Sequence, residues 1–208
     1  MSARVIPDDA AGRTLAIVAL RRGDLVALPT DTVYGIGVAL GTSGGIERLF
    51  AAKRRPPEQS LPVAVKGIQM ADELAVVTYD SRRLMEAFWP GALTIVLEKK
   101  AMVPDVTTGG RREVAVRTPN HQVPLQIIGY SGLPLITTSA NIHGKPSSLT
   151  AEEAKKQLGG EVDLILDGGN ATDRPSTILD MVSVPPRILR LGSVTKEEIM
   201  CVLDYVVL

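Results

Sequence analysis

Short apolar runs rich in β-branched residues alternate with helical patterns along the chain, and this alternation limits its fold more than any other feature. Each run has the length of a buried strand. The runs lie at Leu25–Leu28, Leu61–Val65, Leu93–Leu97, Val114–Arg117, Leu135–Thr138, Val162–Leu166, Thr177–Met181 and Ile188–Leu191. Strands that alternate with helices are typical of α/β proteins. The sequence therefore predicts an α/β fold with roughly eight strands.

Signals at helix ends place the helices between these runs. Gly23 has the character of a C′ glycine, and Pro56 must stop a helix before it. Thr150 and Thr195 are each followed three residues later by glutamate, which is the capping-box pattern. Helices are expected before Gly23, from about Ser43 to Arg54, from Asp80, around Val123–Tyr130, and from Thr150 and Thr195.

The last two expected strands bear on the type of sheet. The segment from Thr177 to Leu191 is too short to hold both strands and a crossover helix, so strands there should be antiparallel. The sheet is therefore predicted to be mixed. Since no repeat, low-complexity segment or linker divides the chain, residues 1–208 are expected to form a single domain.

Composition argues against several classes of protein. Lys+Arg and Asp+Glu both number 23, so the whole chain has no net charge that would draw it to nucleic acid or a membrane. A single cysteine excludes an internal disulfide and fits a reducing compartment, and only two histidines accompany it as zinc ligands. The first residues do not resemble a signal peptide, and no apolar run reaches the length of a membrane span. A cytoplasmic protein is expected.

Familiar nucleotide-binding and hydrolase motifs are absent. Gly144-Lys145-Pro146 lacks the Ser/Thr and the upstream glycine of a Walker A loop. Gly35-Ile36-Gly37 is followed by glycine only at Gly41, so the dinucleotide-binding spacing fails, and there is no G-x-S-x-G elbow. An ATP site in this chain would need a less common design.

Two polar stretches follow expected strands. Pro29–Gly35 brings hydroxyls and a carboxylate to the end of a strand, where open α/β sheets bind ligands. Thr137–Asn141 brings hydroxyl and amide groups that can donate to phosphate or ribose oxygens. Both stretches also suit local turns and caps, and the residues alone leave that alternative open.

Cations stand at the ends of other elements. Lys53-Arg54-Arg55-Pro56 closes a helix, where positive charge either complements the helix dipole or clamps a polyanion. Arg117 and Arg190 are attached to strands. Because arginine is rarely buried unpaired, each requires an anion, which either the protein or a ligand supplies.

Taken together and in this order, these stretches resemble the YrdC family of threonylcarbamoyl-AMP synthases. The matching stretches are PTDTVYG (29–35), KRRP (53–56), WPGALTIVL (89–97), VAVRTP (114–119), TTSAN (137–141), STILD (176–180) and ILRLG (188–192). The resemblance implies a twisted open mixed sheet flanked by helices, with a large concave cavity. The chain departs from the family at Asp31, where glutamate is commoner, and at Arg54, where a small residue is more usual.

The resemblance also implies roles for individual residues. It assigns ATP binding to Lys53, Arg55, Ser139, Asn141, Ser147 and Arg190. It assigns threonine binding to Thr32, Tyr34, Arg117, Thr137 and Ser176. It implies no covalent catalytic nucleophile and no metal held by the protein alone, with Mg²⁺ carried by ATP.

The implied reaction joins L-threonine, bicarbonate or CO₂, and ATP into threonylcarbamoyl-adenylate and pyrophosphate. The product would pass to tRNA threonylcarbamoyl-transferase proteins, which modify adenosine in tRNA. Three other interpretations stay open: an RNA-binding module that uses the same concave surface, a YciO-type paralogue with another substrate, and a hydrogenase-maturation module with another acceptor. The zero net charge and the 3% aromatic content favour weak or indirect tRNA binding.

Overall fold

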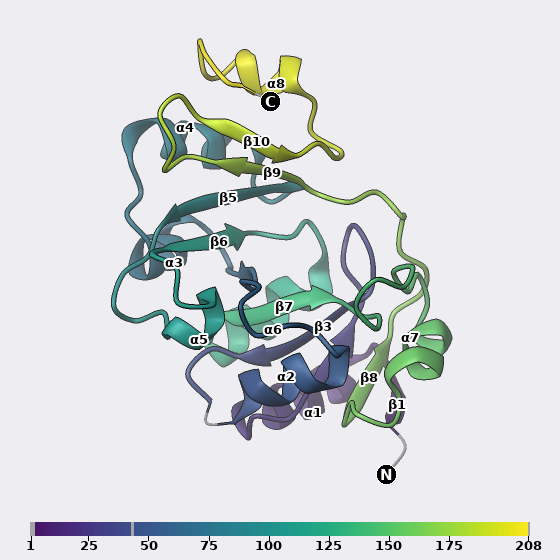
Figure 1. Cartoon of the computed structure of the whole chain (residues 1–208). Helices are drawn as coiled ribbons and strands as arrows, with labels where there is room; N and C mark the ends of the chain where they lie inside the picture. Colours follow the sequence, from purple (N-terminus) through teal and green to yellow (C-terminus); the bar gives the residue numbers. More distant parts are fainter. Residues whose placement is uncertain (1–2, 43, 208) are drawn as a thin grey trace.

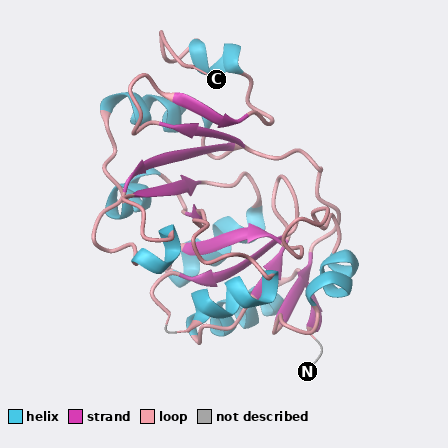
Figure 2. Ribbon diagram, viewed as in Figure 1, coloured by secondary structure: helices cyan, strands magenta, loops and turns pink. Residues whose placement is uncertain are grey.

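One twisted mixed sheet flanked by helices forms the frame of the molecule in the computed structural model, which describes residues 3–42 and 44–207 (Figures 1 and 2). The strand order is β1-β8-β2-β3-β7-β4-β6-β5-β9-β10. The strands are β1 (Arg4–Pro7), β2 (Val26–Leu28), β3 (Gly35–Ala39), β4 (Val63–Ala64), β5 (Leu93–Glu98), β6 (Glu113–Arg117), β7 (Leu135–Ser139), β8 (Leu164–Asp167), β9 (Thr177–Asp180) and β10 (Arg187–Arg190). Parallel and antiparallel pairs alternate irregularly, and β9 pairs with β10 antiparallel. The predicted mixed α/β sheet is confirmed.

All eight expected strands are present, and two further strands, β1 and β3, escaped the sequence analysis. β3 contains Gly35 and Gly37, and glycine has low strand propensity. β1 is a four-residue edge strand in which only Ile6 is buried, so it lacks an alternating pattern. The strand expected at Leu61–Val65 shortens to the two residues of β4.

Within residues 3–42 and 44–207, eight helices surround the sheet. They are α1 (Ala10–Arg21), α2 (Gly45–Lys53), α3 (Ile68–Leu74), α4 (Tyr79–Phe88), α5 (Asp105–Thr108), α6 (Gln122–Ser131), α7 (Ala151–Leu158) and α8 (Lys196–Met200). The short helices α3 and α5 were not expected. Gly23 follows the end of α1 with φ 84°, as a C′ glycine does. The expected start of the second helix at Ser43 lies outside the described residues.

The helix caps agree with the sequence signals in most respects. Thr195 forms a complete capping box with Glu198. Thr150 caps α7 through Glu153 N–H, but the Glu153 carboxylate accepts from Leu149 N–H at 2.6 Å, so this box is incomplete. Thr78 caps α4, which places the first residue of that helix one position before the expected Asp80.

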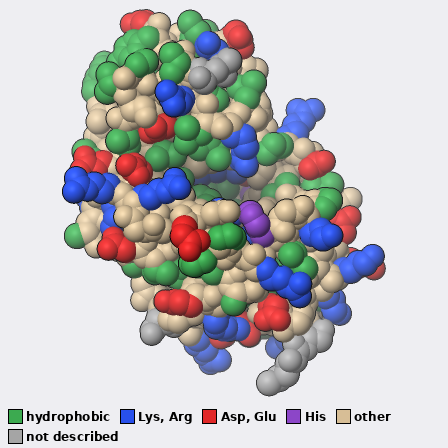
Figure 3. Space-filling view, in the orientation of Figure 1, with side chains coloured by type: hydrophobic (Ala, Val, Ile, Leu, Met, Phe, Trp, Pro, Cys, Tyr) green, Lys and Arg blue, Asp and Glu red, His purple; other side chains and the backbone are tan. Residues whose placement is uncertain are grey.

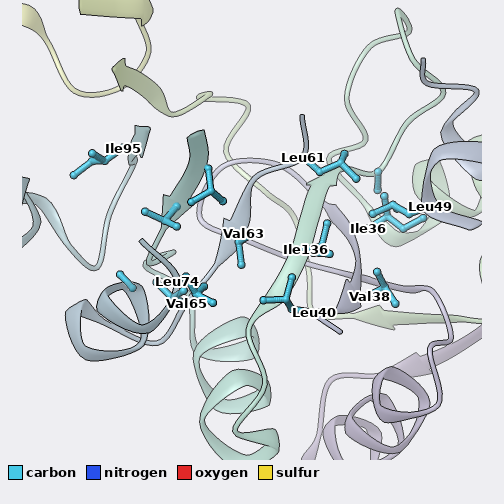
Figure 4. Packing of buried hydrophobic residues seen from close by; sticks show 14 of the residues in the cluster. Ile36, Val38, Leu40, Leu49, Leu61, Val63, Val65, Leu74, Ile95 and Ile136 are labelled. Atoms are coloured by element: carbon cyan, nitrogen blue, oxygen red, sulfur yellow. The ribbon is translucent and has the colours of Figure 1, made fainter. Parts of the chain in front are cut away.

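Both faces of the sheet are covered by apolar packing. Along β2, Ala27 joins the larger cluster, whereas Val26 and Leu28 point to the smaller cluster under α1 and α6. The larger cluster includes Ile36, Leu49 and Ile136 (Figure 4). Because both faces of the central strands are buried, most polar side chains there gather near the strand ends.

The middle of the sheet is narrow. β4 has two residues, and it joins β7 antiparallel on one side to β6 parallel on the other. In Figure 1, the upper part of the sheet consists of β5, β6, β9 and β10, and its lower part includes β3, β7 and β8. The space-filling view shows a hollow in the surface between the upper and lower parts (Figure 3). The size of the expected concave cavity stays a prediction.

Candidate active site

The loop between β2 and β3 is a tight turn held by its own hydroxyls. Thr30 Oγ1 donates to Val33 O at 2.6 Å and accepts from Thr32 N–H at 3.2 Å. A Cβ atom on Gly35 would lie 3.0 Å from Thr137 Oγ1, so glycine allows β3 to approach this threonine. Thr137 Oγ1 donates to Ile36 O at 3.3 Å. The loop and the end of β7 are therefore fixed against each other.

Arg117 ends β6 and is enclosed by acceptors. Its Nη2 donates to Asp31 Oδ2 at 2.7 Å, its Nη1 to Thr32 Oγ1 at 3.2 Å and its Nε to Gly91 O at 2.8 Å. The side chains of Arg117 and Asp31 are only 14% and 16% exposed. Burial lowers the pKa of Arg117, and the charge of Asp31 opposes that shift. The protein thus supplies one anion for this guanidinium.

Arg190 ends β10 and lies close to Arg117. Its guanidinium donates to Ser176 O at 2.9 Å and to Ser176 Oγ at 3.1 Å, and Ser176 Oγ bonds Thr94 Oγ1 at 2.9 Å. Burial lowers the pKa of Arg190, and its positive charge contributes to lowering that of Arg117. Within the described residues, no carboxylate lies within 4.0 Å of Arg190. We call Asp31, Thr32, Arg117, Ser176 and Arg190 the arginine cluster.

Lys53 ends α2 and is 1% exposed. Its Nζ donates to Ser139 O at 2.5 Å and to Asn141 O at 2.7 Å, with Asn141 Oδ1 at 3.4 Å. Burial, helped by the charge of Arg55, lowers the pKa of Lys53 to about 7. An ammonium surrounded by neutral oxygens ties α2 to the end of β7.

Arg55 lies just beyond α2 with little to neutralise it. Its Nη2 donates to Ser60 O at 2.9 Å, and its buried Nε has no hydrogen-bond partner among residues 3–42 and 44–207. Burial lowers its pKa. Neither Lys53 nor Arg55 forms an ion pair with any carboxylate of the described chain. We call Lys53, Arg55, Ser139 and Asn141 the lysine cluster.

The predicted residues Asn141 and Tyr34 hold neighbouring loops in place, and Ser147 lies in one of these loops. Asn141 Nδ2 donates to Ile142 O at 2.9 Å and Lys145 O at 2.7 Å, so both of its N–H groups face the protein. Tyr34 is fully buried, and its hydroxyl bonds Gly169 O at 2.8 Å. Ser147 is half-buried beside Ser148, whose O accepts from Tyr34 N–H at 2.9 Å.

The structure therefore gathers eight of the predicted residues into two groups, leaves Tyr34, Thr137 and Ser147 outside them, and adds contacts that the sequence analysis did not predict. Asp31 was noted as the carboxylate of the Pro29–Gly35 stretch and as a departure from the family, but its pairing with Arg117 was not predicted. Thr94 was also missed, because a threonine inside an apolar strand gives no signal. His121 caps α6 through Nδ1; burial lowers its pKa, and the nearby Asp31 and Asp8 oppose the shift.

One recess elsewhere on the molecule lacks the unpaired cations of the two clusters. A recess of about 490 Å³ is lined by Arg4, Arg48, Glu161 and Asp163 among others, and it contains none of the predicted site residues. Arg48 already pairs with Asp163 there, at 2.8 Å. In the part of the chain that the structure describes, no helix has the length and apolarity of a membrane span. The same residues contain no group of three or more His, Cys, Asp or Glu side chains that could hold a metal ion.

Comparisons with known proteins find a family model and several relatives that match most of the chain. The model of the Sua5_yciO_yrdC family, described as telomere recombination, matches residues 18–192. A threonylcarbamoyl-AMP synthase of Pyrococcus abyssi is 40% identical over 182 residues, which cover 86% of this chain and 54% of the relative. A putative threonylcarbamoyl-AMP synthase of Mycobacterium tuberculosis is 37% identical over 194 residues, which cover 92% and 89% of the two chains.

A solved structure is similar over nearly the whole chain. The crystal structure of P. abyssi Sua5 complexed with L-threonine has a TM-score of 0.92 at 35% identity, covering 99% of this chain and 62% of that one. This chain thus spans about half the length of the curated P. abyssi relative.

Proposed function

Because the chain belongs to the Sua5/YciO/YrdC family, we propose that it is an L-threonylcarbamoyladenylate synthase. It joins L-threonine, bicarbonate or CO₂, and ATP, and it releases pyrophosphate. The names of its relatives and the threonine bound to P. abyssi Sua5 support this proposal. The residues of the two clusters account for the chemistry.

The observation that carries the proposal is the unequal charge of the two clusters. Lys53 and Arg55 face neutral oxygens and no carboxylate among the described residues, which favours a polyanion such as a triphosphate. Arg117 is balanced by Asp31, which favours a ligand that carries both charges, as an amino acid does. A site that receives ATP beside threonine needs both kinds of charge environment.

The residue roles follow from this division. We assign ATP to the lysine cluster, with Ser147 and Arg190. Arg190 bonds Ser176, so it lies at the boundary with the amino-acid side. We assign threonine to Thr32, Tyr34, Arg117, Thr137 and Ser176, with the threonine carboxylate on the free N–H groups of Arg117.

The chemical steps need positioning and charge rather than a covalent intermediate. The ammonium of threonine loses one proton to solvent to become an amine, the amine attacks CO₂, and the nitrogen loses a second proton to solvent as the carbamate forms. A carbamate oxygen then attacks the α-phosphorus of ATP, the bond from that phosphorus to the bridging oxygen breaks, and pyrophosphate leaves. Lys53, Arg55 and Arg190 stabilise the negative charge on the phosphates. Mg²⁺ accompanies ATP and neutralises part of that charge.

The cellular setting is part of the same proposal. The protein works in the cytoplasm as a single domain and passes its product to tRNA threonylcarbamoyl-transferase proteins. Contact with tRNA is weak or indirect, because the chain carries no net positive charge.

Pyrophosphate release tests the function. Purified protein with ATP and Mg²⁺ should release pyrophosphate only when both threonine and bicarbonate are present. Release that does not depend on threonine would exclude the proposed substrate and favour a paralogue with another one. A protein inert towards ATP that binds tRNA at moderate salt would favour the RNA-binding interpretation.

A further inference from the structure

Asp31 has one oxygen in use and one that is buried without a partner. Its Oδ2 accepts from Arg117 at 2.7 Å. Its Oδ1 has no hydrogen-bond partner within residues 3–42 and 44–207, although it is buried. A buried carboxylate oxygen without a donor is costly, and such atoms call for an explanation such as a missing ligand.

We propose that Asp31 is the residue that recognises the amino nitrogen of the substrate, through a hydrogen bond from that nitrogen to Oδ1. The inference rests on the proposed function, because it names how the amino-acid side of that site reads its ligand. Oδ2 meanwhile keeps Arg117 in place for the substrate carboxylate.

The contacts of Arg117 explain why Asp31 and the substrate can bind it together. A guanidinium has five N–H groups, two on each terminal nitrogen and one on Nε. Each nitrogen donates one of these N–H groups to the protein: Nε to Gly91 O, Nη1 to Thr32 Oγ1 and Nη2 to Asp31 Oδ2. One N–H group therefore remains on each terminal nitrogen, and a carboxylate can accept one hydrogen bond from each of these two groups with its two oxygens.

The spacing of charges then selects an α-amino acid. Its nitrogen is attached to the carbon that bears the carboxylate, so a carboxylate on Arg117 holds the nitrogen close to the paired Asp31. A ligand without this nitrogen leaves Oδ1 unpaired in a buried position. The nitrogen keeps one N–H after it becomes a carbamate, so the contact persists through the reaction. No proton is transferred to Asp31 in this role.

Two ligands and one substitution test the inference. Asp31→Asn keeps the size of the side chain but offers one oxygen instead of two, so it cannot serve both Arg117 and the substrate. Isothermal titration should use L-threonine and 3-hydroxybutanoate, which has a hydrogen in place of the amine and so offers Oδ1 no donor. Wild-type protein should bind threonine at least ~10-fold more tightly. Asn should reduce that ratio to less than ~3-fold, and Asp31→Glu should restore it.

Asp8→Asn is the matched control. The Asp8 side chain is 14% exposed and also paired with an arginine, but both of its oxygens accept from Arg13, at 2.6 and 2.7 Å. This substitution should leave the ratio of affinities unchanged.

Several outcomes would overturn the inference. Equal binding of both ligands by wild-type protein would do so whether or not a variant folds. An equal loss of both ligands in Asp31→Asn would show that Asp31 only supports the fold of the site. Failure of wild-type protein to bind threonine at all would instead overturn the proposed function, together with the inference.

Discussion

Lys53 of the lysine cluster and Arg117 of the arginine cluster are both largely enclosed by the protein, but they lie in opposite charge environments. Arg117 meets the carboxylate of Asp31 at 2.7 Å. Lys53 meets the backbone oxygens of Ser139 and Asn141. Carbonyl oxygens satisfy N–H donors but do not cancel charge. Lys53 and Arg55 therefore keep an excess of positive charge that a bound anion removes, whereas the charge of Arg117 is balanced by Asp31.

Under the proposed function, this difference distinguishes two ligands within one site. A buried cation that lacks an anion is held at a cost in desolvation free energy, as the lowered pKa of Lys53 indicates. Phosphates recover that cost on binding, so the lysine cluster gains most from ATP. A charge-balanced pair gains most from a zwitterion, which adds one charge of each sign. The predictions below test whether the two clusters bind different ligands, beginning with the largest expected effect.

Arg55→Gln should have the largest effect on ATP. It removes a charge whose contact in the protein is a single bond to Ser60 O, so the fold should survive. Turnover should fall by at least ~10-fold, since a charge-assisted hydrogen bond contributes ~1.5–3 kcal/mol. Threonine affinity should stay the same. Titration of each ligand and steady-state pyrophosphate release measure these effects. A comparable loss of threonine affinity would show that the two clusters do not bind separate ligands.

A proton should enter the lysine cluster with ATP. Burial lowers the pKa of Lys53 to about 7 in the folded protein, below the ordinary value of 10.5, so a fraction of Lys53 lacks its third proton at pH 8. Phosphate binding favours the ammonium and raises that pKa. Binding of ATP at pH 8 should therefore be accompanied by net proton uptake, measured by calorimetry in buffers of different ionisation enthalpy. Lys53→Met should abolish the uptake, and uptake that persists in that variant would refute this assignment.

The same pKa has a consequence for the free energy of unfolding without ligand. Between about pH 7 and pH 10.5 the unfolded chain binds a proton on Lys53 that the folded protein lacks. The contribution of Lys53 to stability therefore rises with pH across this window. Denaturant unfolding should show a smaller pH-dependent increase in Lys53→Met than in wild-type protein.

Arg54→Gly should have the smallest effect, although it removes a charge between Lys53 and Arg55. Arg54 is exposed and has φ 51°, a left-handed conformation that glycine adopts more readily. ATP affinity and turnover should change little, and the free energy of unfolding should change by less than ~1 kcal/mol, as relief of backbone strain offsets the added chain entropy. A loss comparable to that of Arg55→Gln would show that the wrong arginine was assigned to ATP.

Elements with their own local signal could be predicted from the sequence. The apolar run of β5 and the capping box of α8 each determine their element from a few neighbouring residues. β3 could not be predicted in this way, because Gly35 and Gly37 form a strand through pairing with β2 and β7 on either side. The two-residue β4 likewise depends on neighbours distant in sequence.

In the candidate site, too, features with a local sequence signal could be predicted, and features formed by distant contacts could not. The motifs indicated that Lys53, Arg117 and Arg190 are cations that require an anion from the protein or from a ligand. They could not show that Asp31 reaches Arg117 across 86 positions of sequence while Lys53 finds only carbonyl oxygens. Charge balance arises from tertiary contacts, so the division of the site into two environments required the structure.

Titration of Arg117→Lys with each ligand tests the central distinction most directly. Lysine keeps the charge beside Asp31 but loses the two-pronged geometry that a carboxylate needs. Threonine binding should weaken by ~1–3 kcal/mol, and ATP binding should change little. An unchanged threonine affinity, or an equal loss for threonine and ATP, would contradict the assignment of the two clusters to two ligands.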